Sequence, residues 1–205
     1  GPRSVSIMMA ARLSVMMFLQ FFIWGCWFVT LGTFLRANFQ ASGAQTGLAF
    51  STQSWGAIIA PFIIGLMADR YFNAERILAV VHLCGALLMY QMFRAQDFAQ
   101  FYPSILAYMI AYMPTLALVN SISFRQLTDP SKQFSFVRVW GTLGWIVAGL
   151  MISLVFHWDA QEPAAQGALR NTFALGAVMS LTLAIYSLTL PSTPPRAANA
   201  GEFSL

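Results

Sequence analysis

Long, nearly uninterrupted apolar runs divide the 205-residue chain, and short polar connectors separate them. A helix that crosses a bilayer needs about 20 mostly apolar residues at roughly 1.5 Å of rise each. Six runs meet this requirement: residues 13–35, 46–68, 77–93, 101–124, 134–158 and 169–190. Because the runs are continuous rather than alternating, and because an open sheet cannot satisfy its edges in lipid, the pattern predicts an all-α integral membrane protein with six transmembrane helices.

The two ends of the chain lie outside this pattern. Gly1-Pro2 without an initiating Met is typical of the remnant that a protease leaves in protein expression, and residues 1–12 are expected to form a cytoplasmic lead. Residues 13–190 are predicted to form the six-helix bundle. The sequence Pro-Ser-Thr-Pro-Pro-Arg then cannot continue a helix, so residues 191–205 are expected to be a cytoplasmic linker or tail.

The composition agrees with a membrane protein. Hydrophobic residues make up 58% of the chain and charged residues only 9%, whereas a soluble domain has about 25% charged residues. A cytosolic enzyme, a nucleic-acid-binding module and a disordered chain are therefore excluded. Cys26 and Cys84 lie inside apolar runs, so the sequence indicates neither disulfides nor a metal or cofactor site.

The Lys and Arg residues of the connectors predict the orientation. Seven would lie on one side of the membrane and three on the other: Arg3, Arg12, Arg70, Arg76, Arg125, Lys132 and Arg196 against Arg36, Arg94 and Arg170. Cytoplasmic loops carry the excess of Lys and Arg, so both termini are expected in the cytoplasm.

One basic residue lies inside an apolar run. Arg138, Thr142, Trp145 and Gly149 recur at helical spacing and share one face. A lipid-facing Arg near the bilayer centre costs at least ~2.5 kcal/mol, although a residue one turn inside can also snorkel to the headgroups. A guanidinium, a hydroxyl and an indole on one face suggest a wall for a flat, polar ligand.

The first run carries a comparable face with Gln20, Trp24 and Trp27. Both Trp residues lie near the middle of the run, where an interfacial aromatic belt is a weak explanation, although ordinary packing remains open. Gln20 and Trp24 are therefore candidates for lining a cavity.

Three other polar residues in the runs have simpler interpretations. Gln53 and Asn120 are expected to form interhelical hydrogen bonds, and His82 is expected to be structural rather than a proton carrier.

The connector between the second and third runs resembles a known signature. Residues 65–70 read Gly-Leu-Met-Ala-Asp-Arg, and Glu75-Arg76 follows. This resembles the Gly-x-x-x-Asp-Arg loop of the major facilitator superfamily, which helps to hold one access state. The resemblance assigns that conformational role to Gly65, Asp69, Arg70 and Arg76, although residues 72–74 depart from the usual Gly and two basic residues.

Longer strings resemble one family within that superfamily, the bacterial nucleoside:proton symporters. They are Leu-Gln-Phe-Phe-Ile-Trp-Gly-Cys-Trp at 19–27, Ala-Tyr-Met-Pro-Thr-Leu at 111–116 and Arg-Val-Trp-Gly-Thr-Leu-Gly-Trp at 138–145. The resemblance implies that Arg138, Thr142 and Trp145 line a nucleoside site. The family commonly has Phe at the last position, so Trp145 is a departure that reshapes the pocket.

The resemblance also implies an architecture and a set of partners. Family members have twelve helices in two halves with the substrate between them, so this chain is expected to be the N-terminal half, in the bacterial inner membrane. Its helices are expected to form two inverted three-helix repeats, residues 13–93 and 101–190. The expected partners are a nucleoside, the lipid bilayer, a C-terminal half or a second copy, and protons in the complete transporter.

Several alternatives stay open at this point. The chain could transport a sugar or another small polar solute, or act as a half-size homodimer or a scaffold without transport. An intramembrane protease needs a Gly-x-Ser-Gly-like turn and a water channel needs Asn-Pro-Ala loops, and the sequence has neither. No enzymatic activity is therefore expected.

Overall fold

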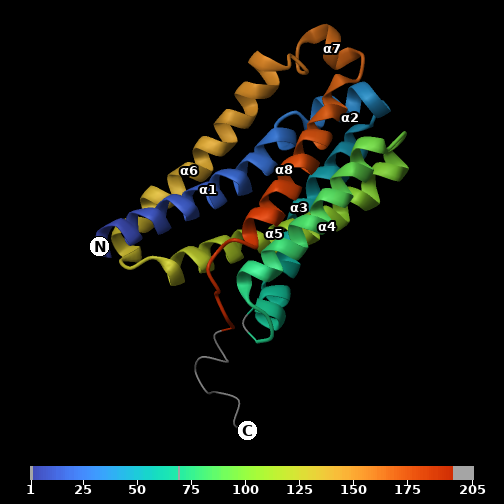
Figure 1. The fold of residues 1–205 in the computed structure, drawn as a ribbon. Helices are drawn as coiled ribbons and strands as arrows, with labels where there is room; N and C mark the ends of the chain where they lie inside the picture. Colours follow the sequence, from blue (N-terminus) through green and yellow to red (C-terminus); the bar gives the residue numbers. More distant parts are fainter. Residues whose placement is uncertain (1, 69, 196–205) are drawn as a thin grey trace.

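The computed structural model describes residues 2–68 and 70–195, in which every regular element is a helix (Figure 1). Six helices are long and apolar enough to cross a membrane, which confirms the predicted fold class. They are α1 (Pro2–Phe28), α3 (Gly43–Ile63) with the π-helix η1 (Ile64–Ala68), α4 (Ala74–Arg94), α5 (Phe98–Gln126), α6 (Pro130–Leu150) with the π-helix η2 (Met151–Val155), and α8 (Asn171–Ser187). Three short helices join them at one end: α2 (Leu31–Phe39), α7 (Gln161–Ala165) and the 3-10 helix η3 (Ala168–Arg170).

The first span differs from the prediction at both ends. It covers Ser6–Phe28 rather than residues 13–35, and α2 is a separate helix beyond it. Arg12 lies within α1, and its guanidinium donates a hydrogen bond to the carbonyl of Thr189, just after the end of α8. The fifth span also ends earlier, at Val155, shortly before His157 adopts a left-handed φ of 55°.

The helix pairing has the symmetry expected of two repeats. Helix α1 makes its most extensive contact with α6, and helix α5 makes its most extensive contact with α3. Helix α4 packs on α8, and the contact between α4 and α5 has its counterpart between α8 and α1. Exchanging α1, α3 and α4 with α5, α6 and α8 therefore reproduces the pattern. Since three crossings reverse the direction of the chain, the two triplets are inverted relative to each other.

Two glycines mark equivalent close approaches in these triplets. A Cβ atom at Gly56 of α3 would collide with the backbone carbonyl of Met109 on α5. A Cβ atom at Gly144 of α6 would collide in the same way with the carbonyl of Phe18 on α1. Small residues allow membrane helices to approach this closely. Both α3 and α6 also continue into a π-helix, so the two repeats share their irregularities.

The segment after α8 is held against the helix ends. The backbone N–H of Thr193 donates to the carboxylate of Glu75 at 2.9 Å, and the N–H of Ala74 donates to the Thr193 carbonyl at 2.9 Å. Arg125 donates to the carbonyl of Pro194 from the end of α5. The N-terminal part of α1 lies at this same end of the bundle, because Tyr186 of α8 donates to the carbonyl of Arg12 (Figure 1).

Candidate functional site

A pocket of about 330 Å³ opens between α1, α3 and α6. It brings together four of the residues predicted from the sequence, namely Arg138, Thr142, Trp145 and Trp24. The remaining lining residues are Phe21, Phe28, Gln53 and Gly141. Apart from the buried Gly141, each lining residue keeps part of its surface exposed, so a small molecule can reach the wall that they form.

Arg138 supplies the charge of this pocket. Its guanidinium carbon lies 4.1 Å from the centre of the Phe21 ring, a cation–π arrangement. The only salt bridge among the described residues joins Lys132 and Asp129, so no acid in that part of the chain neutralises Arg138. Its planar N–H groups therefore remain available to a bidentate acceptor.

Gly141 makes room for this stacked pair. A Cβ atom at position 141 would lie 2.6 Å from the Phe21 ring and 2.8 Å from Nη1 of Arg138. Any larger residue would push the guanidinium or the ring away. Gly141 was not among the predicted site residues, although its position one turn after Arg138 places it on nearly the same helical face.

Aromatic rings form the rest of the wall. Trp24 and Trp145 meet edge to face, with ring centres 5.5 Å apart and planes at 80°. Phe28 contacts both of them, at 5.7 Å and 6.0 Å. The Trp145 backbone and ring lie so close to α1 that a Cβ at Gly25 would come within 3.0 Å of both. This edge-to-face cluster offers ring surfaces against which a flat ligand can stack.

Gln20 lies elsewhere. Its side chain is completely buried, and its amide contacts His82 of α4 and Thr115 of α5 rather than the pocket. Residues Phe21, Trp24 and Phe28 line the pocket instead, so the pocket-lining face of α1 is rotated by about one position from the predicted face. The cause is the pair of hydrogen-bond partners on α4 and α5, which turns Gln20 inward.

Gln53 lies in the pocket although an interhelical hydrogen bond was expected for it. In the parts of the chain that the structure describes, neither its side chain nor that of Asn120 has a hydrogen-bond partner. Gln53 therefore adds a free amide to the wall, from α3. His82 agrees with its structural interpretation, since it is buried and bonded to Gln20.

The residues of the Gly-x-x-x-Asp-Arg loop do not line the pocket. Gly65 lies in η1, Arg70 and Arg76 are exposed, and Asp69 lies outside the described residues. Glu75 is the one acid within a span as the structure bounds it, in the first turn of α4. It is buried against Asn73 and Thr193, and it does not line the pocket either.

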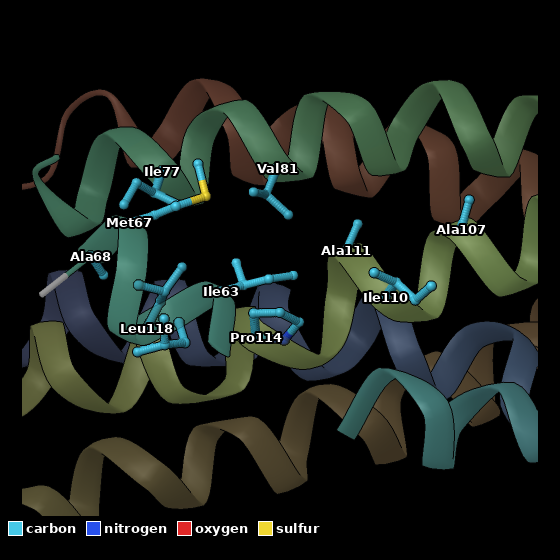
Figure 2. Close-up of a pocket in the computed structure, with 11 residues that line it drawn as sticks. Ile63, Met67, Ala68, Ile77, Val81, Ala107, Ile110, Ala111, Pro114 and Leu118 are labelled. Atoms are coloured by element: carbon cyan, nitrogen blue, oxygen red, sulfur yellow. The ribbon is translucent and has the colours of Figure 1, made fainter. Parts of the chain in front are cut away.

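A second cavity, of about 260 Å³, lies between η1, α4 and α5. Figure 2 shows its lining, which includes Met67, Val81 and Pro114 and consists of apolar side chains. Such a lining offers no side-chain hydrogen bond to a polar ligand. The pocket at Arg138 is the candidate site because it brings together the predicted residues Arg138, Thr142, Trp145 and Trp24.

Comparison with known proteins shows the family. Residues 7–204 match the family described as Nucleoside H+ symporter. The chain belongs to this family. It is 38% identical over 186 residues to the putative nucleoside transporter YegT of Escherichia coli (strain K12), a match that covers 91% of this chain and 43% of that protein. It is 39% identical over 189 residues to the xanthosine permease of the same organism, covering 90% of this chain and 43% of that protein.

The solved structure of the nucleoside transporter NupG has the same fold. It superposes with a TM-score of 0.82 at 30% identity, and the match covers 96% of this chain and 46% of that chain. The chain thus spans about half the length of the relatives that it matches. Its helices correspond to the N-terminal half of NupG, a transporter of the major facilitator superfamily.

Proposed function

We propose that this chain forms the N-terminal half of a nucleoside:proton symporter in the bacterial inner membrane, with both termini in the cytoplasm. We further propose that Arg138, Thr142, Trp145 and Trp24 are its contribution to the nucleoside site. One observation carries the proposal. These four residues, from two helices, lie around one pocket in a chain that belongs to the Nucleoside H+ symporter family.

The pocket chemistry suits a nucleoside. A base is flat and aromatic, so it can stack on the indoles of Trp24 and Trp145. Its carbonyl and ring nitrogen atoms can accept paired hydrogen bonds from Arg138, whose planar donors favour bidentate acceptors. The hydroxyl of Thr142 and the amide of Gln53 both donate and accept, so they can bond ribose hydroxyls.

An exposed apolar stripe runs along the second span. On α3, Trp55, Ile58 and Phe62 are 54%, 60% and 72% exposed, and Leu66 of η1 is 57% exposed. Their spacing places them along one stripe of the helix. At about 100° per residue, Gln53 lies roughly opposite this stripe, so the stripe faces away from the pocket. A second half would close the site over its open mouth between α3 and α6. In the complete transporter that half would supply the opposite wall and the groups that carry protons.

The pocket assignment can be tested by nucleoside binding to the purified chain in nanodiscs. Arg138→Ala should abolish saturable binding because the bidentate donor is lost. Lys132→Ala is the matched control, since Lys132 is an exposed cation on the same helix outside the pocket. Competition by a sugar as effective as competition by a nucleoside, or equal loss in both variants, would contradict the proposal.

A further inference from the structure

A buried hydrogen-bonded network joins three helices behind the pocket. Oε1 of Gln20, on α1, lies 2.8 Å from Nε2 of His82 on α4. Nε2 of Gln20 lies 2.7 Å from Oγ1 of Thr115 on α5. The hydroxyl of Tyr112, also on α5, donates to the backbone carbonyl of Gln20 at 2.7 Å. All four residues are at most 1% exposed, so the network excludes water.

The geometry determines which group donates each hydrogen. Oγ1 of Thr115 lies 2.5 Å from the Tyr112 carbonyl oxygen, and only the hydroxyl has a hydrogen for that contact. Oγ1 must therefore accept from the amide nitrogen of Gln20. The Gln20 oxygen then faces His82, which must donate from Nε2. His82 thus holds the end of a chain of donors that runs through Gln20 to Thr115.

This network contacts the wall of the pocket from behind. The Tyr112 ring lies 5.6 Å from the Trp24 ring, and the His82 ring lies 6.1 Å from Tyr112, nearly edge to face. The Arg138 guanidinium stacks on the ring of Phe21, and Phe21 directly follows Gln20 in the chain. Fixing Gln20 therefore fixes the turn of α1 that presents both Phe21 and Trp24.

We infer that His82 is a positioning residue: by donating to Gln20, it sets the rotation of α1 and holds Trp24 in the pocket wall. The effect of this positioning on nucleoside affinity rests on the proposed function. The placement of Trp24 does not, so the two can fail separately.

The placement can be measured by fluorine NMR on the chain labelled with 5-fluorotryptophan, with Trp24→Phe assigning the Trp24 resonance. His82→Leu removes the donor and should shift or broaden that resonance while the resonance of Trp158 stays unchanged. His82→Gln keeps an amide donor near the same place and should restore the wild-type spectrum. An unchanged Trp24 resonance in folded His82→Leu would overturn the inference.

Two further variants separate positioning from general stability. Glu75→Gln weakens a different buried network, where Glu75 accepts from Thr193, and should lower thermal stability without moving the Trp24 resonance. If His82→Leu does not fold, His82→Phe decides, because it keeps a ring beside Tyr112 and removes the donor to Gln20: a displaced Trp24 resonance supports the inference, and an unchanged one overturns it.

Nucleoside titration then tests the link to function. His82→Leu should raise the dissociation constant roughly 5- to 30-fold, the factor that corresponds to one or two hydrogen bonds, whereas His82→Gln should not. If the wild-type chain binds no nucleoside while the Trp24 resonance still shifts in His82→Leu, the proposed function fails and the positioning role of His82 stands. If affinity falls while the Trp24 resonance is unchanged, the positioning role fails and the site stands.

Discussion

The close contact at Gly144 gives a quantitative prediction about the bundle. A Cβ atom at this position would collide with the carbonyl oxygen of Phe18 and lie 3.0 Å from the carbonyl carbon. Both are backbone atoms of α1, so the helices must separate rather than a side chain turn aside. Such overpacking typically costs about 1–3 kcal/mol.

Gly149→Ala is the matched control for Gly144→Ala. A Cβ at Gly149 meets no atom within 4 Å, on the same helix. Both variants gain the same intrinsic helix propensity, about 0.5–1 kcal/mol, so their difference isolates the collision. For a chain of this size a difference of 1–3 kcal/mol corresponds to roughly 2–12 °C in melting temperature.

The assay is thermal unfolding of both variants in one detergent. Gly144→Ala should melt below Gly149→Ala by the stated margin, and Gly149→Ala should equal or exceed the wild type. Equal melting temperatures would refute the account of how α1 and α6 pack.

Two other predictions concern nucleoside binding in the pocket and the coupling of nucleoside transport to protons. Gly141→Ala should weaken nucleoside binding, because the new methyl group displaces Arg138 from Phe21; titration should show it, and unchanged affinity would contradict the stacked geometry. In liposomes that contain this chain alone, an inward proton gradient should not drive nucleoside accumulation, because no acid lines the pocket and one half supplies only one wall. Gradient-driven accumulation that His82→Ala abolishes would instead identify His82 as a proton carrier.

The residues that line the pocket from α6 were predictable from the sequence, and those from α1 only in part. On α6, one helical face carries Arg138, Thr142 and Trp145, and a charged residue within an apolar run restricts the choice of face. On α1, aromatic residues occur on more than one face, at Phe21, Phe22, Trp24, Trp27 and Phe28, so the sequence did not distinguish the face of Phe21 and Phe28 from the face of Gln20. That choice depends on partners from α4 and α5, which lie 62 and 95 residues away in the sequence.

The fold, too, was predictable from the sequence only in part. Continuous apolar runs predicted six spans because lipid leaves few alternatives for the backbone. The start of α1 was missed because the continuous apolar run begins only after Arg12, whereas the helix already begins at Pro2 and Arg12 bonds the carbonyl of Thr189, just after α8. The docking of Thr193 on Glu75 also depends on a tertiary contact that no local pattern indicates.

The account depends most directly on Thr142 facing a nucleoside site. The test is labelling of Thr142→Cys by a water-soluble maleimide, with Cys84→Ser added because Cys84 is exposed and Cys26 is buried. Lys132→Cys reports the accessibility of the same helix outside the pocket. Labelling at position 142 should be rapid and slowed by saturating nucleoside, while labelling at position 132 should be unaffected. Labelling at position 142 that nucleoside leaves unchanged would contradict the central claim.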